Sequence, residues 1–210
     1  MKIIKKIKDV LVKPTEYFRN TKKERGLKDA FIYYSALSLI FSAAVLLFSN
    51  LLGKLWLEIF SFSGLALKSL QHSTDYKLSM LLIIQLLSYI IGLGTGFLWA
   101  AILHLWILLF GGKGNYNKTY QLYSYTKTPI FILGWVPVIG IFAGIYRLIL
   151  LIRGTAEVHK IKKRTSLLMY LIPYIICWII SISVLMLLFS LISTYLGNQL
   201  TIDAALQGDS

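Results

Sequence analysis

The stretch TYQLYSYTKTPIFILGWVPVIGIFAGIYRLILLIR at residues 119–153 decides how this chain is arranged. It is apolar enough to enter a bilayer, but it contains Pro129 and Pro137, and a proline inside a helix kinks or breaks it. The stretch therefore forms either one membrane span from Pro129 onward or two short spans hinged at Pro137. The choice fixes the side of the membrane on which every later residue lies.

The distribution of Lys and Arg separates these alternatives. With two spans, at 119–135 and 138–153, the inner side holds 17 of the 22 basic residues: ten before residue 29, two at 113 and 118, and five from Arg153 to Arg164. With one span, 13 lie inside and 8 outside. The positive-inside rule favours two spans. We therefore expect the amino terminus in the cytoplasm and the carboxyl terminus outside.

Three further runs are long enough to cross a bilayer, because a core of about 30 Å needs roughly 20 helical residues. They lie at 28–49, 79–110 and 165–192, which makes five spans. A mean hydropathy of +0.69 and only 15% charged residues also exceed what a soluble domain can bury. The predicted fold is an all-α polytopic transmembrane bundle. Spans of 16 or 17 residues reach only about 25 Å, so we expect a buried helical hairpin or locally thinned lipid there.

The segments outside the spans have distinct predicted roles. Residues 1–27 form a basic cytoplasmic lead, whose first helix places Ile3, Ile7, Val10 and Leu11 on one face. Such a helix lies in the headgroup layer, or it packs on its own protein. Residues 51–67 form an amphipathic outer segment or a re-entrant one. Residues 193–210 form a short polar outer tail.

The net charge of +13 indicates an anionic partner. In so apolar a chain this partner is the membrane surface and not nucleic acid. We expect the anionic headgroups to be bound by Lys2, Lys5, Lys6, Lys8, Arg153, Lys160, Lys162, Lys163 and Arg164.

Three ionisable side chains fall within predicted spans: Lys127, Arg147 and His104. Intramembrane charge often marks a functional site. The alternative is that the two cations reach toward headgroups or cap helix ends, and that His104 lies at the interface. These three residues are the candidate buried functional residues.

The residue patterns of enzymes and metal sites are missing from the sequence. His72, His104 and His159 lie in separate segments, and no serine lies in a nucleophile-elbow motif. No HExxH or paired-cysteine spacing occurs, and Cys177 is the only cysteine. We therefore expect no enzymatic activity, no cofactor and no metal.

Several motifs resemble the Yip-one (Yip1) domain family of small polytopic membrane proteins. They are VKPTEYF at 12–18, GGKGNYNKTYQLYSYTKTP at 111–129 and WVPVIGIFAGIYRLILLIRGTAEVHKIKKRTS at 135–166. The resemblance implies five spans with a cytoplasmic amino terminus. Its eukaryotic members bind Rab-type GTPases in vesicle traffic, but this chain lacks their DLYGP element and is more similar to the prokaryotic branch, which implies a cell membrane. The matching positions are Pro14, Phe18, Gly112, Tyr125, Pro129, Pro137, Gly140, Tyr146, Gly154 and His159.

Two functions from different classes fit these features. The first is a non-enzymatic membrane protein that organises lipid or partner proteins, with an inner basic face for acidic headgroups. The second is a small transporter or channel that passes an anionic solute with Lys127 and Arg147. The glycine-rich helix faces would serve packing within one chain or in a homo-oligomer.

Overall fold

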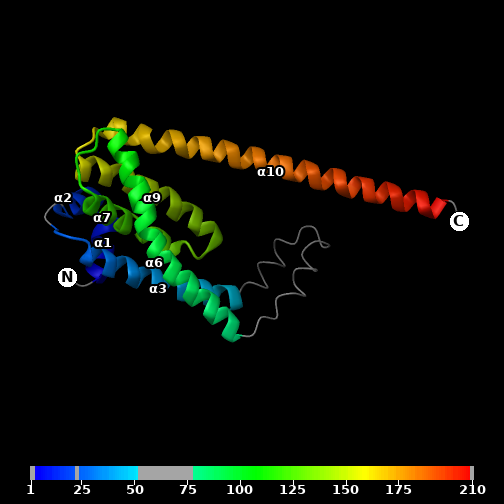
Figure 1. The fold of residues 1–210 in the computed structure, drawn as a ribbon, viewed down its shortest axis with the longest axis horizontal. Helices are drawn as coiled ribbons and strands as arrows, with labels where there is room; N and C mark the ends of the chain where they lie inside the picture. Colours follow the sequence, from blue (N-terminus) through cyan, green and yellow to red (C-terminus); the bar gives the residue numbers. More distant parts are fainter. Residues whose placement is uncertain (1–2, 22–23, 52–77, 209–210) are drawn as a thin grey trace. The chain divides into compact units, whose positions relative to one another are not determined.

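The computed structural model describes residues 3–21, 24–51 and 78–208, whose secondary structure elements are all helices (Figure 1). The chain divides into two units, Met1–Ser166 and Leu167–Ser210. The predicted all-helical class is confirmed. In chain order the helices are α1 (Ile3–Val12), α2 (Pro14–Thr21), α3 (Lys28–Leu51), α6 (Leu78–Leu109), α7 (Tyr116–Thr126), α8 (Thr128–Leu133), α9 (Pro137–His159) and α10 (Lys163–Gly208).

Within the described residues, four helices are long and apolar enough to cross a membrane. Their apolar stretches are Lys28–Phe48, Leu82–Leu109, Val138–His159 and Lys163–Tyr195, which correspond to four of the five predicted spans. Much of their apolar surface is not covered by the chain itself, so lipid must cover it. The protein is therefore an integral membrane protein.

The predicted span at 119–135 differs from the other four because two short helices occupy it. Helix α7 ends at Thr126, and α8 runs from Thr128 to Leu133. Their 11 and 6 residues correspond to helix lengths of about 16 and 9 Å, and neither alone reaches across a bilayer core. A fifth crossing therefore stays a prediction. Helices α8 and α9 pack against each other, but Leu133, Val138 and Phe142 at their connection are exposed, so the hairpin is not buried by the chain itself.

Helix α7 lies at the centre of the first unit. It packs against α3, α6 and α9, and every residue from Thr119 to Thr126 is buried. Its start is defined by Asn115, whose side chain accepts a hydrogen bond from the Lys118 backbone N–H, a normal helix N-cap. Because α7 is rich in Thr and Tyr, its burial places many polar groups in the core, where each needs a partner.

Three segments that are distant in sequence meet at one end of this unit. The Lys113 backbone N–H donates to the His159 carbonyl at 3.1 Å. The segment before α7 and the end of α9 therefore lie side by side. The Lys118 ammonium donates to the carbonyls of Thr21 and Glu24 at 2.8 and 2.6 Å. We call this end, made of residues 3–21, 24–28, 111–118 and 153–164, the basic end.

The amino-terminal lead packs on its own protein. Helix α1 contacts α2 and α8, and α2 contacts α9. Val10 and Phe18 are fully buried, whereas Ile4 and Val12 are exposed. The buried face of α1 therefore differs from the predicted one, since it includes Lys6 in place of Ile3. Whether α1 also lies in the headgroup layer stays a prediction.

Some predictions concern residues beyond those described. Residues 52–67, Lys2 and His72 lie outside the described residues. In the second unit, α10 continues as a helix to Gly208 and so includes most of the predicted outer tail. The side chains described between Leu167 and Tyr195 are mostly exposed and apolar, as a lipid-facing helix requires.

Candidate functional site

A partly buried ion pair within the lead is joined to the central helix through Tyr125. The Lys6 ammonium lies 3.0 Å from Glu24 Oε1 and donates to the Tyr125 hydroxyl at 3.2 Å. The Tyr125 hydroxyl in turn donates to Glu24 Oε2 at 2.6 Å. A buried charge requires such pairing, because isolated charges are costly outside water. The predicted headgroup ligand Lys6 is therefore engaged inside the protein.

The segment that follows α2 is held by two further side chains of α7. The Gln121 amide donates to the Gly26 carbonyl at 2.8 Å, and Lys118 binds the carbonyls of Thr21 and Glu24. Partial burial lowers the pKa of the Lys118 ammonium, and the nearby Glu24 carboxylate opposes that shift. Both α7 side chains thus satisfy backbone carbonyls that a loop would otherwise expose to water or leave unpaired.

Two predicted histidines meet through a threonine that the sequence did not single out. The Gly114 backbone N–H donates to His159 Nδ1 at 3.2 Å, so the proton of this neutral ring is on Nε2. Nε2 lies 3.1 Å from Thr119 Oγ1, and Thr119 Oγ1 lies 2.7 Å from His104 Nδ1. Thr119 Oγ1 therefore accepts a hydrogen bond from His159 Nε2 and makes a second one with His104 Nδ1. His104 and His159, which we call the histidine pair, thus connect α6, α7 and α9 through Thr119.

Lys127 and Arg147 lie near the same aromatic ring. The Lys127 ammonium is 4.8 Å from the ring centroid of Tyr123, and the Arg147 guanidinium carbon is 5.8 Å from it. Lys127 also lies over the rings of Tyr34 and Phe131, at 5.5 and 5.8 Å. Contacts of this kind stabilise a cation whose water has been removed. The structure thus brings two of the three predicted buried residues together, while His104 lies in the histidine pair.

The other predicted headgroup ligands are on the surface of the basic end. Within the described residues, the exposed members of that set are Lys5, Lys8, Arg153, Lys160, Lys162, Lys163 and Arg164. Lys160 caps α9 in the left-handed conformation, with φ of 58°, and turns the chain toward α10. The Ser166 hydroxyl fixes this turn by donating to the Ile152 carbonyl at 2.8 Å. This turn, residues 160–164, which we call the basic turn, is therefore held in place by the fold.

The positions matched by resemblance lie mainly where segments meet. A Cβ on Gly154 would collide with Leu122 and lie 3.1 Å from Phe18, so glycine lets α2 approach α9. Tyr146 donates to the Leu11 carbonyl and joins α9 to the lead. A Cβ on Gly140 would lie 3.1 Å from the Gly134 carbonyl oxygen.

The remaining matched positions shape helix ends. Pro14 and Pro137 begin α2 and α9, and Pro129 lies in the first turn of α8, where its missing N–H costs little. Gly112 donates to the Ile107 carbonyl beyond the end of α6. Tyr125 and His159 have the buried contacts described above.

The model of the Yip1 domain matches residues 8–185. The chain belongs to the Yip1 family. The match covers most of the chain, from within α1 into α10, and so includes the lead from residue 8 onward, His104, His159 and the turn at residues 160–164. No curated protein and no solved structure matches the chain.

Some residues of this Yip1 site escaped prediction. Glu24, Thr119 and Tyr123 were not singled out, although each joins residues far apart in sequence. Thr119 and Tyr123 lie inside the motif at 111–129, and their burial on every side of α7 is the signal that could have found them. Glu24 lies in a basic, polar stretch with no periodic pattern, where only the structure reveals its role.

Proposed function

We propose that this Yip1-family protein organises membrane lipid or partner proteins without catalysing a reaction, and that its basic end binds anionic headgroups. The meeting of three basic segments at one end of the first unit supports this proposal. Lys6 is left out of the proposed lipid contacts, because its ammonium binds Glu24. The seven exposed basic residues remain.

Electrostatic attraction would supply most of the binding free energy of the proposed contact. Near an anionic membrane surface, each Lys or Arg contributes about 1 kcal/mol, and the attraction weakens with salt. Helix α1 adds apolar contact, because exposed Ile4 and Val12 lie beside Lys5 and Lys8. Such a mixture of apolar and basic side chains is typical of a helix at the headgroup layer. The proposed orientation places the basic end and the amino terminus in the cytoplasm and the carboxyl terminus outside.

Lipid retention measured by native mass spectrometry tests the proposal. The purified protein is titrated with phosphatidylglycerol or phosphatidylcholine, and the variant Lys160→Gln, Lys162→Gln, Lys163→Gln is compared with wild type. We expect the variant to bind phosphatidylglycerol at least about tenfold more weakly, since removing three charges costs more than about 1.4 kcal/mol. Phosphatidylcholine binding should not change.

The matched control changes three lysines that the charge count assigns to the outer side, Lys54→Gln, Lys68→Gln and Lys77→Gln. It removes the same charge and should leave phosphatidylglycerol binding within about twofold of wild type, because it spares the basic end. Equal losses in both triple variants would show that only net charge matters, and the proposed site would be abandoned.

Anion transport is the second candidate, and the nearness of Lys127 and Arg147 to one ring favours it. Two cations close together in a membrane protein offer a place for an anion between them. The same protein in liposomes separates the candidates. Anion uptake that is lost in Lys127→Ala, Arg147→Ala would establish transport, and absence of uptake above empty liposomes would leave the organising role.

A further inference from the structure

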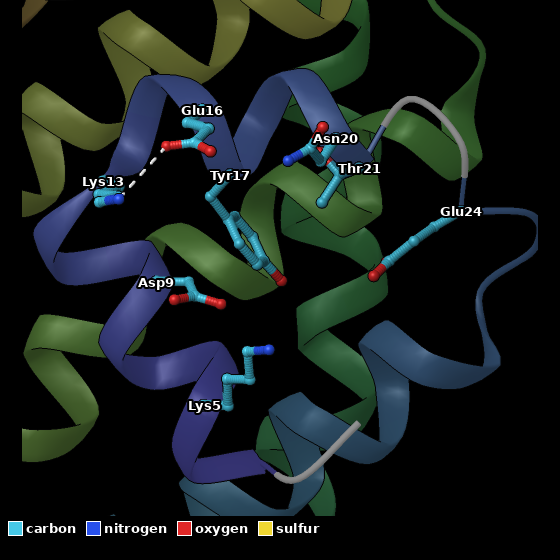
Figure 2. Close-up of a pocket in the computed structure, with 8 residues that line it drawn as sticks. All are labelled: Lys5, Asp9, Lys13, Glu16, Tyr17, Asn20, Thr21 and Glu24. Atoms are coloured by element: carbon cyan, nitrogen blue, oxygen red, sulfur yellow. Dashed lines mark ion pairs between the residues drawn. The ribbon is translucent and has the colours of Figure 1, made fainter.

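A cleft of about 380 Å³ lies beside α1 and α2 at the basic end, a volume typical of small-molecule sites. Figure 2 shows the side chains of Lys5, Asp9, Tyr17 and Glu24 pointing toward one another across it. Lys13 and Glu16 form an ion pair at its edge, with N and O atoms 3.8 Å apart. The lining residues are Lys5, Asp9, Lys13, Glu16, Tyr17, Asn20, Thr21 and Glu24.

The charges of this cleft differ from those of the surface around it. Three of the nine acidic residues of this basic chain line it: Asp9, Glu16 and Glu24. Glu16 and Glu24 each have a lysine partner. Among the described residues, neither Asp9 nor Lys5 forms an ion pair. The cleft thus presents one carboxylate and one ammonium that are available to a ligand.

Tyr17 provides an independent sign of a ligand. Its side chain is 6% exposed. Its hydroxyl makes no hydrogen bond of normal geometry to any described residue, although the nearby Tyr125 hydroxyl affects its pKa. Burial, and next the charge of Glu24, raise the pKa of the Tyr17 phenol far above its usual range. The hydroxyl therefore stays neutral and keeps its proton to donate. Buried hydroxyls in folded proteins normally have a partner.

We propose that this cleft binds a phosphoethanolamine group, with its ammonium on the Asp9 carboxylate and its phosphate on Lys5 and the Tyr17 hydroxyl. A purely anionic ligand would leave the Asp9 carboxylate unpaired, and a purely cationic ligand would leave the Lys5 ammonium unpaired. A zwitterion satisfies both. A primary ammonium also donates hydrogen bonds to carboxylates, which the quaternary ammonium of phosphocholine cannot do.

The location of the cleft indicates where such a group would come from. Helix α1, which lines the cleft, carries exposed Ile4 and Val12, so the cleft lies next to a surface suited to lipid. Phosphatidylethanolamine presents phosphoethanolamine at a membrane surface, and soluble phosphoethanolamine presents the same group without lipid. The proposal does not depend on binding of anionic lipid at the basic turn.

The test compares variants that remove one ligand contact each. Short-chain phosphatidylethanolamine is titrated into the purified full-length protein by native mass spectrometry, and soluble phosphoethanolamine by calorimetry. We expect Asp9→Asn to weaken binding of the headgroup about tenfold, since it removes the charge that pairs with the ammonium, and Tyr17→Phe about threefold to fivefold, since it removes one hydrogen-bond donor to the phosphate. The matched control Asp29→Asn removes an exposed carboxylate outside the cleft and should stay within about twofold of wild type.

Each outcome decides the proposal. Binding of phosphatidylethanolamine alone supports the proposal and identifies the membrane as the source of the group. Binding of both the lipid and soluble phosphoethanolamine also supports it and shows that the free compound is a second source. Equal affinity for phosphatidylcholine, or equal affinity of wild type and Asp9→Asn, would overturn it. If Asp9→Asn does not fold, Lys5→Gln carries the test, because Lys5 is exposed. Phosphatidylglycerol binding should persist in Asp9→Asn, which separates this site from the proposed anionic contact.

Discussion

At the scale of single residues, Gly114 allows the closest approach in the histidine pair. A Cβ at this position would lie 2.5 Å from His159 Nδ1, and the ring is held on its other side by Thr119. We expect Gly114→Ala to lower the free energy of unfolding by about 1–3 kcal/mol, through overpacking and loss of the backbone hydrogen bond to Nδ1. Thermal unfolding of the detergent-solubilised protein would measure this.

Gly144→Ala is the matched control for that substitution. A Cβ there meets nothing within 4 Å, and the residue lies inside α9. Alanine has the higher helix propensity, so this variant should be as stable as wild type or up to about 1 kcal/mol more stable. A similar loss in both variants would mean that contact with His159 does not explain the effect.

Single residues could be predicted from the sequence where their side-chain type is unusual for the surrounding segment. Lys127 and Arg147 stood out because charge is rare in apolar runs, and the structure places both near Tyr123. Their meeting could not be predicted, because it depends on how α7 and α9 pack. Thr119 is an ordinary residue by sequence, and its two histidine partners lie 15 and 40 residues away.

At the scale of helices, α7 was the element that sequence reasoning described least well. The run from 119 to 135 was predicted as a short span, but Lys127 and Pro129 divide it into two helices. Its first half, rich in tyrosine and threonine, is buried by neighbouring helices and not by lipid. Hydropathy measures how apolar a segment is, and it does not distinguish a protein interior that satisfies hydroxyl groups from a bilayer.

The contact between the lead and α7 predicts that Glu24 helps to hold the lead on the protein. Glu24→Ala removes the carboxylate shared by Lys6 and Tyr125 and leaves the Lys6 ammonium unpaired in a buried site. We expect the lead to detach more often, so trypsin should cleave within residues 1–27 about tenfold faster, which corresponds to about 1.4 kcal/mol of lost docking. Gel analysis of timed digests would measure the rate.

Glu16→Ala provides the comparison for that experiment. Its partner Lys13 lies 3.8 Å away, and both side chains are about two-thirds exposed. Exposed pairs contribute little to stability, so cleavage should proceed at the wild-type rate. Faster cleavage in both variants would indicate that any loss of negative charge loosens the lead, and the Lys6–Glu24 pair would lose its assigned role.

At the scale of the whole molecule, the charge distribution predicts which segments share a side of the membrane. The structure brings Lys113 and His159 together, so positions 113 and 160 must be labelled from the same side. We expect cysteines at these positions, in a Cys177→Ser background, to react in inverted vesicles and not in intact cells. A cysteine at position 210 should show the opposite pattern, as the predicted outer tail requires.

Labelling of position 160 from outside intact cells would reverse the proposed orientation. Labelling of 113 and 160 from opposite sides would contradict the hydrogen bond between them. Sequence could predict which basic segments gather, because lipid and the membrane potential act on charge wherever it lies in the chain. It could not predict that one of those segments would bury Lys6, since that depends on a single acidic partner 18 residues away.

The pairing of the lead with α7 also has a consequence for the order of events during synthesis. Lys6 leaves the ribosome early, yet Tyr125 follows it 119 residues later. At about 5–20 residues per second, the wait is on the order of 6–24 s. During that time Val10 and Phe18 have no folded protein surface to cover them. The nearest apolar surface is that of the membrane into which the growing chain is inserted. The nascent lead would thus meet lipid before it meets its own protein.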